Sequence, residues 1–153
     1  MKLKDIDTSN LRLNITPDKL DNMSAYELFN SAMSWWHNDF FDEAYLALKK
    51  VVEKDPDYYH YGDEPYLHLG NYYHGILRDY KGAIELYNKC IENHPYYALA
   101  WEWRGYAYEA LGEYQKLIED FEYLLREKVN SLIPNEERLE EAIEMARKAL
   151  KEE

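Results

Sequence analysis

The stretch Trp101-Glu102-Trp103-Arg104-Gly105-Tyr106-Ala107-Tyr108 places a large aromatic residue four positions before a glycine and a second aromatic residue three positions after it. The stretch Tyr66-Leu67-His68-Leu69-Gly70-Asn71-Tyr72-Tyr73 repeats this spacing, and Leu28, Ala32 and Trp35 occupy the same three places nearer the N-terminus. Steps of three and four residues return to one face of an α-helix. The chain is therefore expected to contain three copies of one helical segment.

A second helical segment follows each copy, and in the first two copies it ends at a proline. Its shared positions are Ala44, Leu48, Val51 and Pro56 in the first copy and Ala83, Tyr87, Cys90 and Pro95 in the second. Proline ends the segment because it cannot continue a helix. Residues such as Gly70, Gly105 and Ala32 must be small because the two helices of a hairpin cross there. The predicted unit is an antiparallel helical hairpin.

These hairpins resemble the tetratricopeptide repeat, whose first helix carries the same aromatic and glycine pattern. The resemblance covers about two thirds of the chain, from Ala25 to about Lys128. It implies an all-α fold, a right-handed superhelix of three antiparallel helical hairpins with a C-terminal capping helix. The expected parts of this single domain, 1–153, are a lead and short helix (1–24), repeat 1 (25–56), an inserted linker (57–64), repeat 2 (65–95), repeat 3 (96–129) and the capping helix (135–152).

The chain departs from the family pattern in two ways. The interval from Pro56 to Pro95 is 39 residues, five more than the 34-residue period. Four of the extra residues fall in the linker and one falls in the turn between Tyr73 and Ala83. The third copy has Arg104, Leu117 and Val129 where the pattern has Leu, Ala and Pro. Such departures are typical of a terminal repeat.

Helix-start signals and periodicity predict how the ends are organised. Ser24 precedes Glu27 by three residues, the capping-box spacing, so a helix should begin near Ala25. Thr16-Pro17-Asp18 predicts a short helix that ends near Asn22, with Pro17 at its first position. Residues 1–15 show no period and are expected to form an extended or mobile lead. The capping helix should bury one stripe: Leu139, Ala142, Ile143, Ala146 and Leu150.

Composition excludes several classes of function. The 153 residues carry a net charge of -12, which repels phosphate backbones and anionic lipids, so neither nucleic acid nor membrane is an expected partner. One cysteine permits no internal disulfide, and the polar N-terminus lacks the apolar stretch of a signal peptide. We therefore expect a cytoplasmic protein. Its 24 aromatic residues are more than these hairpins need for packing.

No motif predicts catalysis, a metal or a cofactor. The sequence contains no nucleophile elbow, phosphate-binding loop, zinc-protease or dinucleotide motif. Its five histidines do not pair at helical spacing, and one cysteine makes a structural zinc site improbable. Cys90 is expected to be buried in packing. The chain is predicted not to be an enzyme unless the acids near His74 form an active site.

In tetratricopeptide repeat proteins a concave groove formed by the first helices holds a peptide or partner helix. By this resemblance the groove residues are Tyr26, Phe29, Met33, Trp36, Leu67, Asn71, His74, Leu99, Glu102, Trp103, Tyr106 and Glu109. Heat-shock co-chaperones of the family hold a carboxylate with Lys, Asn and Arg side chains there. Phe29, Met33, Leu99 and Trp103 replace those charges and only Asn71 is retained, so a carboxylate clamp is rejected. The apolar and partly acidic groove suits an amphipathic helix or an apolar segment with basic residues.

Two alternatives concern these aromatic residues. The N-terminal segment, rather than a partner, could cover Tyr26 and Phe29, because large exposed apolar patches are uncommon. The linker and the turn after Pro95 offer a second candidate surface: Tyr58, Tyr59, Tyr61, Tyr96 and Tyr97. The linker rings could instead fold back onto the first two hairpins, since aromatic rings favour burial.

The resulting functional prediction is a non-catalytic protein-protein interaction module, an adaptor, chaperone or assembly factor that binds a protein or peptide. Two alternatives stay open. One is a protein similar to the chaperones of type III secretion translocators, although the N-terminal segment is short and the linker is foreign to them. The other is a structural subunit that self-associates, for which a homodimer is expected.

Overall fold

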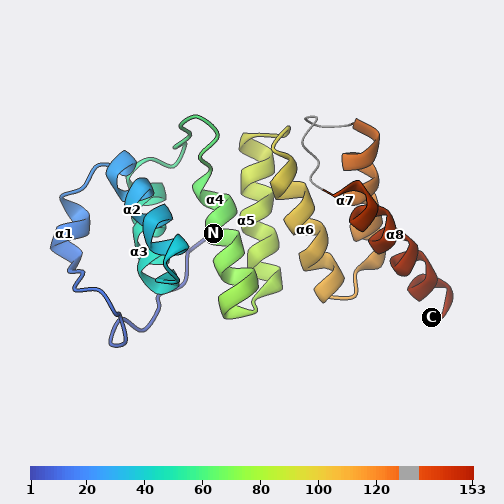
Figure 1. The fold of residues 1–153 in the computed structure, drawn as a ribbon, viewed down its shortest axis with the longest axis horizontal. Helices are drawn as coiled ribbons and strands as arrows, with labels where there is room; N and C mark the ends of the chain where they lie inside the picture. The colour runs from blue at the N-terminus through green and yellow to red at the C-terminus, as the bar shows by residue number, and fades with distance from the viewer. Residues whose placement is uncertain (128–134) are drawn as a thin grey trace. The chain divides into compact units, whose positions relative to one another are not determined.

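The computed structural model describes residues 1–127 and 135–153, and the predicted end of repeat 3 at Val129 lies outside them. Along the chain the helices are α1 (Pro17–Asp21), α2 (Ala25–His37), α3 (Phe41–Lys54), α4 (Pro65–Tyr72), the π-helix η1 (Tyr73–Leu77), α5 (Tyr80–Asn93), α6 (Ala98–Ala110), α7 (Tyr114–Glu127) and α8 (Glu136–Lys151). They follow one another as consecutive hairpins (Figure 1). The prediction of an all-α fold of the tetratricopeptide type is confirmed.

The chain divides into two compact units, Met1–Tyr72 and Tyr73–Glu153. The first unit contains α1 to α4, and the second contains η1 and α5 to α8. The division falls where α4 passes into η1, within the second hairpin. Each unit has its own core and is described by itself.

In the first unit α2 and α3 pack through small residues, and α4 packs on α3. Ala32 and Ala44 are fully buried, as their spacing predicted. The rings of Tyr45 and Tyr72 stack with centroids 4.3 Å apart. The Tyr72 hydroxyl donates a hydrogen bond of 2.6 Å to Asp42 Oδ1. The two buried rings fill the space between α3 and α4, and the Tyr72 hydroxyl has a hydrogen-bond partner there.

The helix starts of the first unit are those that the sequence predicts. The Ser24 hydroxyl accepts a bond from the Glu27 backbone N–H, and the Glu27 carboxylate accepts one from the Ser24 N–H, which completes the capping box. Thr16 caps α1, Pro17 is its first residue and Asn22 follows its end. Local side-chain chemistry therefore determines both starts.

The N-terminal segment before α1 is not helical, and it is held against α3. Lys4 O accepts a bond from the Tyr45 hydroxyl, and Asp5 pairs with Lys49 at 2.7 Å. The backbone N–H of Leu13 donates to Glu43 Oε1 at 3.0 Å. Residues 1–16 lie outside the helices, as the sequence predicted, and side chains of α3 bond to them at three places.

The second unit has a core between α6, α7 and α8. Its buried members are Leu117, Ile118, Phe121, Leu124, Leu139, Ile143 and Ala146. Ala142 and Leu150 pack against this core, so the whole predicted stripe of the capping helix faces α7. Gly105 lies directly under the ring of Phe121, which explains why this position of α6 must be small.

The hairpin turns share one geometry, and the second turn is one residue longer. The backbone N–H of Phe40 donates to Trp35 O and that of Glu113 donates to Tyr108 O, each across five residues. In the second hairpin the N–H of Asp79 donates to Tyr73 O, across six residues. The extra residue predicted between Tyr73 and Ala83 is accommodated in η1, because a π-helical turn holds one more residue than an α-helical turn.

Candidate functional site

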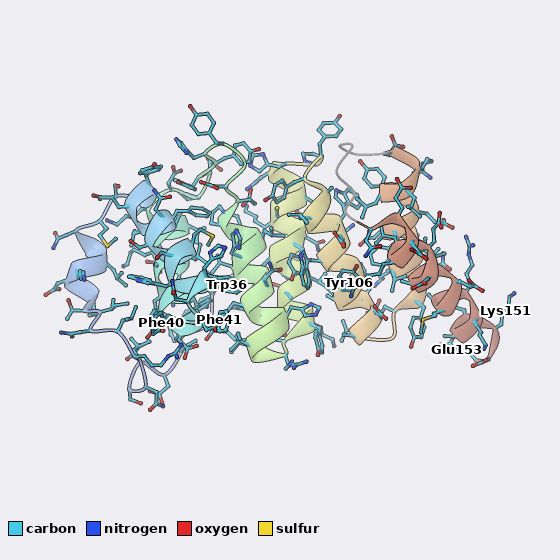
Figure 2. The ribbon with its side chains drawn as sticks, in the orientation of Figure 1. Trp36, Phe40, Phe41, Tyr106, Lys151 and Glu153 are labelled. Atoms are coloured by element: carbon cyan, nitrogen blue, oxygen red, sulfur yellow. The ribbon has the colours of Figure 1, made fainter. Side chains whose placement is uncertain are left out.

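In the first unit three of the predicted groove residues are accessible on α2. Tyr26 is 51% exposed, and Met33 and Trp36 are partly buried. The indole of Trp36 lies edge-on to Phe41 with centroids 5.0 Å apart (Figure 2), and His68 is 6.2 Å away. These contacts hold the indole while part of it stays in solvent. Asn71 of α4 is also partly buried.

Two predicted groove residues of this unit are in the core instead. Phe29 is 1% exposed and Leu67 is 3% exposed. The ring of Phe29 stacks on Tyr58 at 5.4 Å and meets the edge of His68 at 5.9 Å. The prediction that Phe29 and Leu67 line an open groove is wrong, because both side chains are buried; Tyr58 of the linker and His68 of α4 lie against Phe29.

The alternative in which the N-terminal segment covers Phe29 is also wrong. That segment bonds to α3, whereas the rings over Phe29 belong to the linker and α4. Burial disfavours the charged imidazolium and lowers the pKa of His68 to about 4. The charge of His37 also lowers this pKa, by less. His68 is therefore neutral near pH 7 and packs as an aromatic ring.

In the second unit η1 and α6 bring three predicted residues together. The His74 ring lies edge-on to Trp103 at 5.7 Å, and Trp103 lies edge-on to Tyr106 at 5.6 Å. Each of the three is partly buried, with part of its surface accessible. Tyr80 supports His74 from α5, with centroids 5.1 Å apart. We call His74, Trp103 and Tyr106 the α6 aromatic cluster.

Acidic and basic side chains border this cluster. The Tyr106 hydroxyl donates a 3.0 Å bond to Glu102, and the Arg138 guanidinium of α8 lies 4.7 Å from the centre of its ring. Burial, with the charge of Glu102, raises the pKa of Tyr106 to about 12. Glu109 is exposed on the same helix, and Leu99 is 38% exposed. The cluster therefore combines accessible rings with carboxylates.

The second candidate surface is only partly exposed. Tyr58 is buried on Phe29, so the alternative in which linker rings fold back holds for this one ring. Tyr59 is 48% exposed and Tyr61 is 95% exposed. Tyr96 is exposed and Tyr97 partly buried, and both belong to the second unit.

Sequence analysis did not identify Asp120 as the partner of Arg104. The Arg104 guanidinium donates to both Asp120 oxygens at 2.8 and 2.6 Å and to Asn88 Oδ1 at 2.7 Å. Trp101 lies under it, 4.7 Å from the ring centre. An arginine at a position where the family pattern has leucine was the available signal. The group ties α5, α6 and α7 together.

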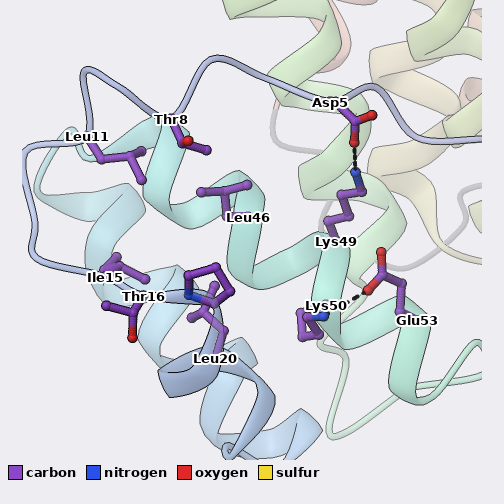
Figure 3. Close-up of a pocket in the computed structure, with 11 residues that line it drawn as sticks. Asp5, Thr8, Leu11, Ile15, Thr16, Leu20, Leu46, Lys49, Lys50 and Glu53 are labelled. Atoms are coloured by element: carbon purple, nitrogen blue, oxygen red, sulfur yellow. Dashed lines mark hydrogen bonds and ion pairs between the residues drawn. The ribbon is translucent and has the colours of Figure 1, made fainter.

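A cavity of about 490 Å³ lies between the N-terminal segment, α1 and α3 (Figure 3). Its apolar wall includes Leu11, Ile15, Leu20 and Leu46. Of its rim lysines, Lys49 pairs with Asp5, and Lys50 pairs with Asp21 at 2.7 Å and Glu53 at 3.3 Å. Since acids already neutralise both lysines, the rim offers no net positive charge to an anion, and we assign no ligand to it.

Within residues 1–127 and 135–153 no three His, Cys, Asp or Glu side chains gather as a metal site would require. No helix in those ranges has both the length and the apolar character needed to cross a bilayer.

Comparison with known proteins identifies the repeats. Profiles described as tetratricopeptide repeat match residues 66–95 and 86–119. The first tetratricopeptide domain of Spaghetti (RPAP3), bound to the HSP90 peptide SRMEEVD, has a TM-score of 0.68 at 21% identity, and the match covers 84% of this chain and 94% of that one. The TPR2B domain of yeast Sti1, in its pHsp70 complex, has a TM-score of 0.64 at 19% identity and coverages of 84% and 98%.

A crystal structure of MamA has a TM-score of 0.71 at 25% identity, with 87% of this chain and 67% of that chain covered. No curated protein sequence matches the chain significantly. At these identities the likeness to RPAP3 and Sti1 concerns the fold alone.

Proposed function

Because the chain is a tetratricopeptide repeat protein, we propose that it is a non-catalytic module that binds an apolar or amphipathic segment, carrying basic residues, of a partner protein. Domains of this family are typically binding modules without catalytic activity. As an adaptor, chaperone or assembly factor, the protein would need surfaces rather than reactive groups.

The observation that carries this proposal is the α6 aromatic cluster. Trp103 and Tyr106 present accessible ring surface, and neighbouring rings hold them in place. Such pre-ordered aromatic side chains lose little conformational entropy when a partner binds, which is why Trp and Tyr dominate binding energy at interfaces. Leu99 extends the apolar surface of α6.

The charges beside the cluster favour a basic partner. Glu102 and Glu109 lie on α6, and the whole chain carries a charge of -12. Arg138 neutralises part of this acidity where it covers Tyr106. A segment with apolar residues on one face and lysine or arginine on the other would match rings and carboxylates together.

The first unit has accessible side chains of its own, which we propose as a separate contact region. Tyr26, Met33 and Trp36 are accessible on α2, and Asn71 on α4 is partly buried. Phe29 and Leu67 are buried packing residues, so we do not propose that they contact the partner.

A second candidate function is the binding of a chaperone-derived acidic peptide. RPAP3 is described with the HSP90 peptide SRMEEVD, and Sti1 with pHsp70. The side chains of this chain argue against such a ligand, since Met33, Leu99 and Trp103 stand where carboxylate-binding side chains would be needed. The carboxylates of Glu102 and Glu109 would repel an acidic peptide.

Fluorescence anisotropy with two labelled peptides tests the proposal against this alternative. One peptide is SRMEEVD, and the other is a designed helix with leucines on one face and lysines on the other. We expect the chain to bind the leucine-lysine helix and not SRMEEVD, with affinity that falls as salt is added. Trp103→Ala should weaken binding at least tenfold, since truncation of an interfacial tryptophan typically costs about 2 kcal/mol or more.

Tyr96→Ala is the matched control, because Tyr96 is exposed outside the proposed surface. Unchanged affinity in Trp103→Ala would refute the assignment of the site, and tighter binding of SRMEEVD than of the basic helix would favour the second candidate. Light scattering completes the test: a stable homodimer that protects Trp103 from solvent would instead indicate a self-associating subunit.

A further inference from the structure

The linker contains a tight turn that the groove proposal does not use. His60 and Asp63 form an antiparallel bridge, in which the Asp63 N–H donates to His60 O at 2.9 Å. Tyr61 and Gly62 between them have φ values of 50° and 92°. Two central residues with positive φ make this a hairpin turn of the kind that favours asparagine followed by glycine.

Aromatic contacts fix the turn on α2. Tyr58, next to the turn, is buried in a stack on Phe29. The His60 ring lies edge-on to Tyr26 at 5.1 Å and to Tyr61 at 4.4 Å. Tyr26, His60 and Tyr61 thus form one row of rings that starts on α2 and ends at the tip of the turn.

Folding does not explain a tyrosine at the tip. A left-handed backbone is unfavourable for a side chain with a Cβ, and aromatic residues are rare there. Tyr61 gains no burial in return, because it is 95% exposed. Strain at an exposed position that stability alone would give to asparagine or glycine is a recognised mark of a functional residue.

The surroundings of the rings are acidic. From Asp55 to Tyr66 the chain has four carboxylates, Asp55, Asp57, Asp63 and Glu64, and neither lysine nor arginine. Asp55 and Asp57 are exposed and Asp63 is partly buried, whereas Glu64 is buried. Burial raises the pKa of the Tyr58 hydroxyl, and the charge of Asp63 raises it further, as expected for a carboxylate close to the rings.

We propose that Tyr26 and Tyr61, with the carboxylate of Asp63, form a binding surface for an arginine-bearing segment of a partner protein. We call it the linker surface. A guanidinium group can lie flat on a tyrosine ring and donate to a carboxylate in the same plane, which an ammonium group cannot do. The rings supply the stacking face and Asp63 supplies the charge. This surface is distinct from the α6 aromatic cluster and does not depend on it, and it shares only Tyr26 with the residues proposed on α2.

Fluorescence anisotropy tests the linker surface with a labelled hexapeptide of alternating arginine and glycine, and with lysine-glycine and glutamate-glycine counterparts. We expect the arginine peptide to bind best and the glutamate peptide not to bind. Tyr61→Leu should weaken binding about two- to fivefold, the range for an exposed cation-π contact. Tyr61→Phe should bind as the wild type does, because phenylalanine keeps the ring face. Asp63→Asn should weaken binding and reduce its salt dependence.

Tyr96→Leu is the control for a mutated exposed tyrosine, and circular dichroism verifies that each variant is folded. Equal loss of affinity in Tyr96→Leu and Tyr61→Leu would overturn the assignment to the linker. Equal binding of the arginine and glutamate peptides, or no binding of the arginine peptide to the wild type, would overturn the proposal itself. Trp103→Ala should leave this interaction unchanged, so the failure of the groove proposal and the failure of this one are separate results.

Discussion

Gly105→Ala is the most direct test of how α6 and α7 pack. A Cβ built on Gly105 would lie 2.1 Å from Cε1 of Phe121 and 2.8 Å from Cδ1 and Cζ. Carbon atoms in contact prefer a separation of about 3.5 to 4.0 Å. The Phe121 ring would have to move away by about 1.4 Å before its Cε1 atom was about 3.5 Å from the added Cβ.

The Phe121 ring is enclosed by other side chains. Phe121 is fully buried, and Tyr106 lies edge-on to it at 5.3 Å. Alanine gains up to about 1 kcal/mol over glycine through helix propensity. Overpacking of a rigid core costs about 1 to 3 kcal/mol and sometimes more. We expect the free energy of unfolding to fall by about 2 kcal/mol, since an overlap with a buried ring belongs at the upper end of that cost.

Gly75→Ala is the control variant, for which we expect no loss of stability. Gly75 lies in η1 and has no atom within 4 Å of the position of an added Cβ. The substitution adds no clash and restricts the unfolded chain, so we expect stability to be unchanged or to rise by up to about 1 kcal/mol.

Urea unfolding followed by circular dichroism compares the two variants with the wild type. The double variant Gly105→Ala with Phe121→Leu should be less destabilised than the sum of its single variants, because the smaller side chain relieves the overlap. A Gly105→Ala variant as stable as Gly75→Ala would refute the packing argument.

Two further predictions concern buried groups. Arg104→Met should lower the free energy of unfolding by about 3 to 5 kcal/mol, because it leaves the Asp120 carboxylate buried without its cation. The double variant Arg104→Met with Asp120→Leu should recover part of this loss. Urea unfolding measures both, and a double variant less stable than Arg104→Met would contradict the prediction. The pKa of His68, about 4 in the folded protein and about 6.5 when unfolded, predicts a stability contribution that is complete above pH 6.5 and is lost as pH falls toward 4, by up to about 3 kcal/mol. His68→Phe should remove this acid-side loss, and an unchanged stability-against-pH curve would show that another group causes it.

Much of the fold was predictable because the relevant interactions are local. The capping box of Ser24 and Glu27 and the short helix at Pro17 depend on residues a few positions apart. The small positions at Ala32, Ala44 and Gly105 follow from the helical period, which places them on the face where helices cross. The extra residue of the second hairpin was countable, but its form as a π-helical turn was not.

The candidate site was less predictable because exposure depends on partners distant in sequence. Phe29 has the spacing of a groove residue, yet Tyr58 of the linker covers it. Asp120 became part of a buried ion pair only because α7 packs on α6. The linker has no period of its own, and helical spacing within α7 does not show which residue of α6 Asp120 meets.

By itself the sequence determined the helical class, the hairpin order, the helix starts and the acidic, aromatic character of the surface, since periodicity, capping and composition act through neighbouring residues. Only the tertiary structure decided which rings are accessible. It buried Phe29 and Tyr58 against each other, left Tyr61 at a strained tip, and gathered His74, Trp103 and Tyr106 into one cluster. The physical reason is that burial is a property of three-dimensional neighbours, which the spacing of residues along the chain does not specify.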